Sequence, residues 1–526
     1  MNRMLDRRRD TWTEVREGVL EGRSGLRPIR TLQELTSILS AAREASQAWA
    51  ELPVRERVSG LARAGEFLLT RADALAQAIA DATGKTRIEA MATEVIPARM
   101  ALSYYGRHAE RFLRPHRLPP SSLLLVNKWS RLVRAPYGVV GIISPWNYPF
   151  AIPFSEIVMA LLAGNAVVFK GARQTHGVSG EIERCLRHCG IPEDLFTPLH
   201  MPGDLAGPAL LTAGIDKLFF TGSVAVGKQL MAKAAETLTP LSLELGGNDP
   251  MLVCEDADVE RAVSGAVWAG LQNCGQSCGG VERIYVHESV YQPFLDRLRA
   301  RVESLKIGPD VDFSTDMGAL TTERQLRTVR LHLEDALARG AEVAARSRMP
   351  DGLSGNFMDA AVLTRVDHRM LVMREETFGP LLGVMKVGSM DEAVRLANDS
   401  IHGLTASVWS RNVRKAEAMG RRIQAGVITI NDHLVSHGMP ETPWGGFKAS
   451  GIGRTHGELG FQEMTQPQVI VHDLLGSARR NLWWPPYSEA IYRGLKGAMD
   501  MLYGVCLSQR AAGFKSLIKI LPRLFR

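Results

Sequence analysis

The chain has 526 residues, of which 45% are hydrophobic, 23% charged and 6% aromatic. A chain of this length forms about three domains or one large two-lobed body, and its apolar fraction excludes general disorder. The net charge of +7 is mild and the basic residues are mostly interleaved with acidic ones. This pattern excludes a nucleic-acid-binding protein but allows an anionic cofactor or a membrane surface.

Cysteine content and hydrophobic runs predict a cytoplasmic protein. Six cysteines in so long a chain do not make a disulfide framework. The stretch of residues 1–9 is basic, but no apolar stretch follows it, so we expect no signal peptide. No 18 apolar residues run uninterrupted, so we expect no membrane-spanning helix and predict free, reduced thiols.

The pattern of apolar residues predicts helices first and then alternating strands and helices. Apolar spacing near 3.6 predicts helices over residues 31–113, and a proline-rich break follows at 115–120. We then expect strands at 139–143, 166–170 and 217–220, and helices at 155–163, 178–189 and from 224 to about 236. Short buried strands that alternate with helices predict a parallel sheet with an open edge for a ligand.

A glycine-containing turn is the first candidate site. Gly222, Ser223 and Gly227 lie where a predicted strand ends and a helix begins. Such a turn either holds a phosphate on backbone N–H groups at the helix N-terminus or only reverses the chain. The run is not GxGxxG, so the ordinary dinucleotide fingerprint is absent.

A cysteine and a glutamate are the second and third candidates. Cys278 lies between small residues, and it is either an accessible nucleophile or a small core residue. Glu244 lies between two leucines, and it is either a general base with a raised pKa or a carboxylate that binds the backbone at a strand end. Cys274 and Cys278 have C-x₃-C spacing, but no second pair completes four ligands, so we expect no metal.

Seven motifs in a fixed order resemble the aldehyde dehydrogenase superfamily over roughly residues 30–472. They are Pro145-Trp146-Asn147-Tyr148-Pro149, Lys170, Phe220-Thr221-Gly222-Ser223, Glu244-Leu245-Gly246-Gly247, Gly275-Gln276-Ser277-Cys278, Glu375-Glu376-Thr377-Phe378-Gly379-Pro380 and Pro443-Trp444-Gly445-Gly446-Phe447-Lys448-Ala449-Ser450-Gly451. The 34-residue gap from Glu244 to Cys278 is also similar to that of the family.

The resemblance implies an α/β fold of the aldehyde dehydrogenase type. We expect a Rossmann-type dinucleotide-binding domain in residues 1–113 and 137–246, and an α/β catalytic domain in residues 247–450. A small β oligomerisation arm is expected in residues 114–136 and 451–475, and a helical, amphipathic tail in residues 476–526. The resemblance also implies a homodimer or homotetramer.

The resemblance also implies the roles of single residues. Cys278 is the expected nucleophile, Glu244 the base that activates water, and Asn147, with the backbone N–H of Cys278, the oxyanion hole. The residues expected to bind NAD or NADP are Trp146, Lys170, Arg173, Gly222, Ser223, Gly227, Gly246, Glu376 and Phe378. The thioester on the cysteine would be hydrolysed rather than transferred to CoA, because the hydrolytic glutamate is present.

Arg173 departs from the family pattern. The family usually has Lys-Pro-Ser-Glu where this chain has Lys170-Gly171-Ala172-Arg173, and that glutamate binds the ribose of NAD. Arg173 either pairs with the 2′-phosphate of NADP or points to solvent, so both cofactors stay open.

The substrate is predicted to be an apolar aldehyde, either long-chain aliphatic or aromatic. Ser155 stands where succinic semialdehyde dehydrogenases have an arginine for the distal carboxylate, and the small Ser277 and Gly279 flank the nucleophile. The alternatives are a semialdehyde dehydrogenase of small-metabolite catabolism and a noncatalytic, membrane-tethered scaffold.

The last fifty residues extend beyond the usual end of the family. They contain Trp483 and Trp484, and from Met501 onward they carry basic but no acidic residues among apolar ones: Arg510, Phe514, Lys515, Leu517, Ile518, Lys519, Leu521, Arg523, Leu524, Phe525 and Arg526. A basic amphipathic helix either lies on a membrane surface or packs on the enzyme, where it could cover the substrate entrance.

Overall fold

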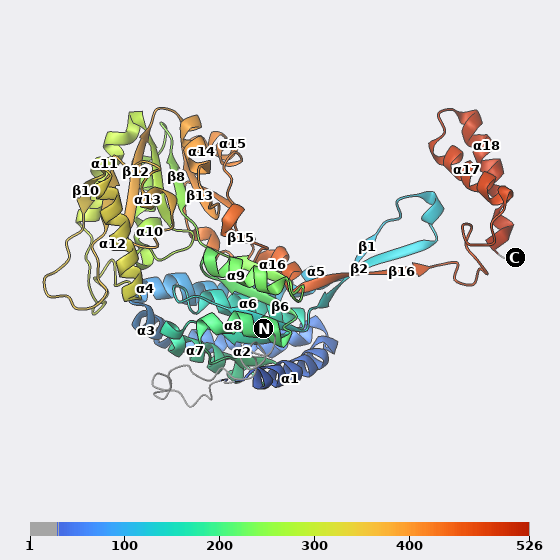
Figure 1. Ribbon diagram of the computed structural model, residues 1–526, viewed down its shortest axis with the longest axis horizontal. Helices are drawn as coiled ribbons and strands as arrows, with labels where there is room; N and C mark the ends of the chain where they lie inside the picture. The colour runs from blue at the N-terminus through green and yellow to red at the C-terminus, as the bar shows by residue number, and fades with distance from the viewer. Residues whose placement is uncertain (1–28, 30, 525–526) are drawn as a thin grey trace, which may run out of the picture. The chain divides into compact units, whose positions relative to one another are not determined.

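The computed structural model describes residue 29 and residues 31–524, which form two compact units (Figure 1). The first unit contains the described residues up to Leu113 together with Pro136–Gln466, and the second contains Arg114–Ala135 and the chain from Pro467 onward. The basic stretch of residues 1–9, Phe525 and Arg526 lie outside the described residues.

A six-stranded sheet in the first unit has the strand order β15-β7-β6-β3-β4-β5. Its strands are β3 (Val139–Ile143), β4 (Ala166–Lys170), β5 (Phe196–Pro198), β6 (Lys217–Thr221), β7 (Leu241–Glu244) and β15 (Gly451–Ile452). All neighbouring pairs are parallel except β15 with β7. The three strands expected from short apolar runs are therefore confirmed, two of them with the expected bounds.

Helices α1 (Leu32–Glu51), α2 (Val54–Thr70), α3 (Ala72–Thr83), α4 (Arg87–Ala90), α5 (Ile96–Leu113), α6 (Ala151–Ala163), α7 (His176–His188), α8 (Gly203–Ala213), α9 (Val224–Ala234) and α16 (Gly457–Glu463) accompany this sheet. A π-helical turn at Met91–Val95 joins α4 to α5. Helix α6 begins at Ala151, four residues earlier than expected, and every residue in it is buried. A helix that is covered on all sides shows no amphipathic period, which is why the sequence located only its second part.

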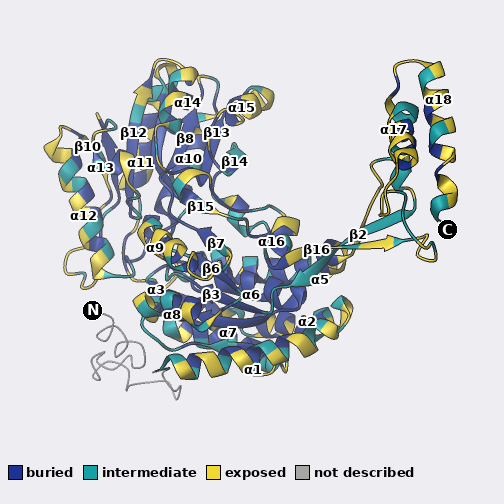
Figure 2. Ribbon diagram, turned by 45° about the vertical axis from the view of Figure 1, so that its right-hand side comes forward, coloured by how far each residue is buried: buried dark blue, intermediate teal, exposed yellow. Residues whose placement is uncertain are grey.

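A seven-stranded sheet in the first unit has the order β10-β11-β12-β9-β8-β13-β14. Its strands are β8 (Asp249–Val253), β9 (Val281–His287), β10 (Glu342–Arg346), β11 (Ala361–Thr364), β12 (Leu381–Val387), β13 (Thr405–Trp409) and β14 (Val427–Ile430). The helices are α10 (Val259–Leu271), α11 (Glu288–Glu303), α12 (Glu323–Ala338), α13 (Leu371–Arg374), α14 (Met390–Asn398) and α15 (Val413–Gly420). Figure 2 shows the central strands of both sheets as buried, with exposed residues on the outer helices.

The second unit combines the β arm and the C-terminal tail. Strands β1 (His116–Leu118), β2 (Lys128–Pro136) and β16 (Thr465–Asp473) form a three-stranded sheet in the order β1-β2-β16. Helices α17 (Glu489–Tyr503) and α18 (Leu507–Ile518) follow, and a 3₁₀ turn at Leu521–Leu524 comes last. Ala498, Leu517 and Ile520 form a small buried cluster against which Leu124 of the arm packs.

The second segment of the arm begins at Pro467, later in the chain than expected. Residues 451–466 were expected in it, but they belong to the first unit, because Gly451 and Ile452 pair with Glu244 and Leu243 of β7. Among the described residues, no helix is both long and apolar enough to cross a membrane.

Candidate active site

Cys278 lies in the loop between α10 and β9, where two cavities meet. The 3₁₀ turn Gln272–Gly275 forces the chain into left-handed conformations, with φ of 53° at Asn273 and 56° at Cys274. Gly275 follows with φ of 73°, and a Cβ there would lie 2.2 Å from the carbonyl oxygen of Gly379. This tight turn places Cys278 in the walls of a cleft of about 620 Å³ and of a separate cavity of about 350 Å³.

The larger cleft lies at the carboxyl ends of β3, β4, β6 and β7, where parallel sheets bind ligands. The expected cofactor residues that line it are Trp146, Lys170, Gly222, Ser223, Gly246, Glu376 and Phe378. Asn147, Glu244 and Cys278 line it as well. The structure therefore gathers most of the residues expected from the sequence around one opening.

Two positive groups face this cleft. Ser223 caps α9, accepting a hydrogen bond from the backbone N–H of Val226 at 3.4 Å, so the positive end of the helix dipole lies in the cleft wall. Lys170 ends β4, and no described residue hydrogen-bonds its ammonium group. Burial lowers the pKa of Lys170. A buried cation and a helix N-terminus in the wall of one cleft fit the ribose and pyrophosphate of a dinucleotide.

A half-buried glutamate, Glu376, closes the other side of the cleft. Glu376 accepts a hydrogen bond from the backbone N–H of Gly247 at 2.9 Å, and burial raises its pKa to about 8. A Cβ at Gly246 would lie 2.4 Å from the Glu376 carboxylate, so only glycine leaves this side chain in place. The ring of Phe378 meets that of Trp146 edge to face at 5.5 Å between centroids. Glu376 is thus available to ribose hydroxyls, which completes the fit of a dinucleotide.

Glu282 positions the Glu376–Phe378 segment, a role that no sequence motif indicated. Its buried carboxylate accepts hydrogen bonds from the backbone N–H groups of Thr377 and Phe378 at 2.8–3.0 Å, and from the Asn248 amide at 2.7 Å. Burial raises the pKa of Glu282 to about 7, and these hydrogen bonds oppose that rise.

Two expected cofactor residues do not line the cleft. Gly227 lies inside α9, where a Cβ would be 2.7 Å from the Leu245 side chain, so the structure gives this glycine a packing role. Arg173 is exposed in the short turn Arg173–Thr175, while its neighbour Gln174 lines the cleft. An interaction of Arg173 with a 2′-phosphate therefore stays a prediction.

Glu244 and Cys278 share a third, water-sized cavity. Its volume is about 20 Å³ and Glu156 also lines it. A space of that size holds about one water molecule. The Oε2 atom of Glu244 has no hydrogen-bond partner among the described residues. A water molecule there would lie between a free carboxylate oxygen and the thiol.

The surroundings of this cavity favour the protonated, neutral forms of the two glutamates and of the thiol that line it. Burial, and then the neighbouring Glu156, raise the pKa of Glu244 well above its usual value. Burial raises the pKa of Glu156 to about 8, and burial followed by Glu376 and Glu244 raises the pKa of the Cys278 thiol. Glu156 was missed by sequence reasoning, although it is the one charged residue of the otherwise apolar helix α6. The fraction of molecules in which Glu244 or Cys278 has lost its proton therefore increases as the pH rises through these raised pKa values.

Asn147 lies in the wall of the same cleft. Its Nδ2 donates to the carbonyl oxygen of Gln276 at 3.1 Å, and its buried Oδ1 has no partner among the described residues. Its backbone carbonyl accepts from Lys85 Nζ at 2.8 Å and from Asn273 Nδ2 at 3.0 Å. These bonds tie the Asn147 backbone to the loop that carries Cys278.

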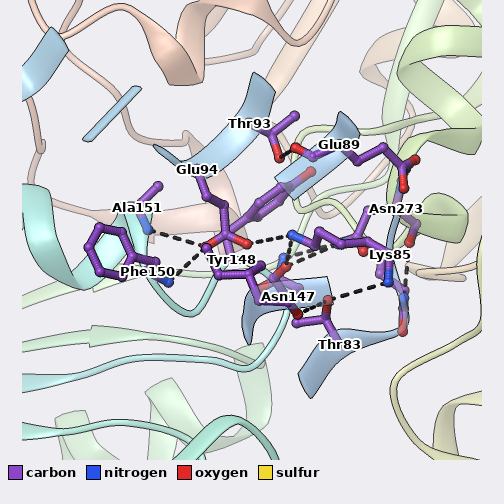
Figure 3. A network of polar contacts seen from close by, with 12 residues as sticks. Thr83, Lys85, Glu89, Thr93, Glu94, Asn147, Tyr148, Phe150, Ala151 and Asn273 are labelled. Carbon is purple, nitrogen blue, oxygen red and sulfur yellow. Dashed lines mark hydrogen bonds and ion pairs between the residues drawn. The ribbon is translucent and has the colours of Figure 1, made fainter. Parts of the chain in front are cut away.

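A buried ion pair holds this arrangement together (Figure 3). Lys85 Nζ lies 2.7 Å from Glu94 Oε1, and both side chains are fully buried. The other oxygen of Glu94 accepts from the backbone N–H groups of Phe150 and Ala151, where α6 begins. Glu89 accepts from the backbone N–H of Asn273 at 2.7 Å. The α3–α5 segment thus fixes both the Asn147 loop and the Cys278 loop.

The cavity of about 350 Å³ on the other side of Cys278 is mainly apolar. Its walls include Ile96, Pro97, Met100, Tyr148, Trp268, Leu434, Val435, Met439 and Trp444. Asp432 is the charged residue in this described wall, and no Lys or Arg belongs to it.

Ser155 and Gly279, which the sequence associated with the substrate pocket, do not provide open space in it. Ser155 does not line the 350 Å³ cavity, and its hydroxyl lies 3.1 Å from that of Tyr105 in the core. Ser277 lines the cavity, but the space at Gly279 is filled, because a Cβ there would be 2.9 Å from the Trp444 ring. The room beside the nucleophile therefore comes from Ser277 and not from Gly279.

Comparison with known proteins identifies the family. Residues 26–470 match the aldehyde dehydrogenase family. The chain belongs to this family. Its members are oxidoreductases that act on aldehydes, so the chain is an enzyme of that kind.

Relatives of this enzyme carry different substrate names. It is 40% identical over 477 residues to 4,4′-diapolycopene aldehyde oxidase of Methylomonas sp, covering 89% of this chain and 86% of that protein. The crystal structure of succinate-semialdehyde dehydrogenase from Burkholderia pseudomallei has 33% identity and a TM-score of 0.80, covering 84% of this chain and 90% of that one. An E. coli NADP-dependent enzyme has 30% identity and a TM-score of 0.80, with coverage of 84% and 90%.

Proposed function

We propose that this aldehyde dehydrogenase oxidises an apolar aldehyde, long-chain aliphatic or aromatic, to the carboxylic acid with NAD or NADP. The observation that carries this proposal is the position of Cys278 between a dinucleotide-sized cleft and an apolar cavity. A nucleophile at that junction can contact an aldehyde from one side and a nicotinamide from the other.

The residues divide the reaction between them. The Cys278 thiolate attacks the aldehyde carbon, and the oxyanion that forms accepts hydrogen bonds from Asn147 Nδ2 and the backbone N–H of Cys278. A nicotinamide dinucleotide held by Lys170 and Glu376 would supply the hydride acceptor, so that the thiohemiacetal on Cys278 would be oxidised to a thioester. Glu244 then removes a proton from water in the small shared cavity, and the resulting attack releases the acid.

The walls of the apolar cavity support a substrate without a second carboxylate. Asp432 would repel the distal carboxylate of a semialdehyde, and no described cation in this wall would pair with it. The semialdehyde alternative therefore lacks support at the site. A noncatalytic scaffold is also disfavoured, because the three expected catalytic groups meet in one place.

A chain-length series tests the substrate class. With NAD or NADP and without CoA, NAD(P)H absorbance should rise with aldehyde, and kcat/KM should increase up to about fourfold per methylene until the cavity is filled. Succinic semialdehyde should be a poorer substrate than butanal, and Asp432→Asn should narrow that gap. No NAD(P)H formation with any aldehyde, or a preference for the semialdehyde, would contradict the proposal.

We propose that Arg173 binds the 2′-phosphate of NADP. A charge-assisted hydrogen bond of this kind contributes about 1.5–3 kcal/mol, so Arg173→Glu should lower the NADP-to-NAD ratio of kcat/KM by roughly tenfold or more. The matched control is Arg299→Glu, an exposed arginine on α11. An unchanged ratio in Arg173→Glu would show that Arg173 points to solvent instead.

We also propose that the enzyme acts in the cytoplasm as a homodimer or homotetramer. Strand β16 is an edge of the three-stranded sheet and exposes Val469 and Val471. An exposed apolar edge strand favours pairing with another chain, which supports an oligomer built through the arm.

A further inference from the structure

The second unit differs strongly from the first in charge. The chain segments that form it, residues 114–135 and 467–526, contain 14 Lys and Arg but 3 Asp and Glu, whereas the rest of the chain contains 49 and 53. The mild net charge of the whole protein is therefore the sum of a strongly basic unit and a slightly acidic one. A concentrated positive charge attracts anionic surfaces.

The same unit also exposes an unusual amount of apolar surface. Of the 38 large hydrophobic side chains exposed in the described part of the chain, 18 lie in the second unit, which has 80 of the 495 described residues. Trp483, Trp484 and Tyr487 are among them, directly before α17. Tryptophan and tyrosine are the residues that favour the interface between lipid and water.

Helix α18 separates its residues into three stripes. Gly513 and Leu517 are buried toward α17, and a Cβ at Gly513 would lie 2.5 Å from the carbonyl oxygen of Gly497, so the two backbones touch. Leu507, Phe514 and Ile518 form a second stripe that continues to Leu521, and all four are exposed. Lys515 and Lys519 form a third, exposed stripe beside the apolar one.

The connection between the two helices extends the apolar stripe. Tyr503, Val505 and Leu507 are 72%, 97% and 84% exposed, so the tip of the hairpin is apolar and uncovered. Packing against α17 thus buries one face of α18. The apolar stripe and the basic stripe next to it stay exposed to solvent. That combination is typical of helices that lie in the interface of an anionic membrane.

We propose that the α17–α18 hairpin, with Trp483 and Trp484, binds the enzyme to the surface of an anionic lipid bilayer. Phe514, Ile518 and the hairpin tip enter the acyl region, while Lys515 and Lys519 pair with lipid phosphates. The inference rests on charge and exposure in the second unit and does not depend on the substrate. It also brings the enzyme to the phase in which an apolar aldehyde dissolves.

Vesicle flotation of the full-length protein tests the proposal. The wild type should float with vesicles of phosphatidylcholine and phosphatidylglycerol but not with phosphatidylcholine alone, and high salt should reduce the bound fraction. Lys515→Glu with Lys519→Glu, and separately Phe514→Ser with Ile518→Ser, should each lower the partition coefficient about tenfold or more.

Matched variants on the first unit provide the controls. Arg299→Glu with Arg414→Glu makes the same change of charge, and Leu69→Ser with Leu331→Ser removes apolar side chains of comparable exposure. These variants should float like the wild type. All variants should keep wild-type circular dichroism and turnover of a short, soluble aldehyde, which separates a failure of this proposal from a failure of the proposed reaction.

Three outcomes would overturn the proposal. The wild type could stay unbound with anionic vesicles, or the tail variants could float as well as their controls. Alternatively, the wild type could fail to bind vesicles, and sedimentation velocity could show that Phe514→Ser with Ile518→Ser dissociates an oligomer. That last result would assign the stripe to contacts between copies of the chain.

Discussion

Replacing Cys278 with alanine should lower the steady-state rate of aldehyde oxidation by roughly a thousandfold or more. The thiol lies where the dinucleotide cleft and the apolar cavity meet, and no other cysteine lines either one in the described chain. Cofactor binding should persist, because Lys170 and Glu376 stay in place. Stopped-flow NAD(P)H absorbance and cofactor titration measure the two quantities, and near wild-type turnover would refute the assignment.

Glu244→Gln provides the contrasting variant for the same experiment. It keeps the nucleophile but removes the base from the water-sized cavity, so it should give a single burst of NAD(P)H followed by very slow turnover. Cys278→Ala should show no burst. Because burial and Glu156 raise the pKa of Glu244, wild-type turnover should fall as the pH is lowered through that raised pKa. A Glu244→Gln variant with normal steady-state turnover would exclude Glu244 as the hydrolytic base.

Replacing Lys85 with methionine should destabilise the fold by about 3–5 kcal/mol. The substitution leaves the fully buried Glu94 carboxylate without its cation and also removes a hydrogen bond to the Asn147 carbonyl. The free energy of unfolding in urea measures this loss. Loss of the hydrogen bond to its carbonyl should also shift the Asn147 backbone and with it the side chain that stabilises the oxyanion. In the folded fraction of the sample, the factor by which kcat falls should therefore exceed the factor by which KM rises.

Two further variants distinguish the effect of losing the buried Lys85–Glu94 pair from the effect of losing an exposed ion pair. Arg55→Met removes one partner of the exposed Arg55–Glu110 pair, whose atoms are 3.8 Å apart, and should change stability by less than about 1 kcal/mol. Adding Glu94→Gln to Lys85→Met should restore part of the lost stability, since the buried charge is then gone. Equal effects of Lys85→Met and Arg55→Met would contradict the proposed role of the buried pair.

The sequence predicted the local elements around the site well. Strands β3 and β4 have the expected bounds because each is a short run of mostly apolar residues that ends at a turn. Helix α9 begins at the expected residue because Ser223 caps it through a short-range hydrogen bond. Cys278, Glu244 and Asn147 were recognised from motifs, each of which is a property of a few neighbouring residues.

The supporting residues were not predictable from the sequence, because their roles depend on distant partners. Lys85 reaches Asn147, and Glu282 reaches Thr377, across 62 and 95 residues. Glu156 has an unusual pKa because the packing around α6 buries it. Gly279 suggested free space next to the nucleophile, yet the Trp444 ring occupies that space.

The sequence by itself determined the family, the candidate catalytic residues and the basic, amphipathic nature of the tail, because these follow from motifs and local composition. Only the tertiary structure decided that Cys278 lies between two cavities and that Glu244 shares a water-sized space with it. It also decided which stripe of α18 packs against α17 and which stays exposed. The physical reason is that burial and long-range contacts arise when separate segments pack together, and a linear pattern does not contain that pairing.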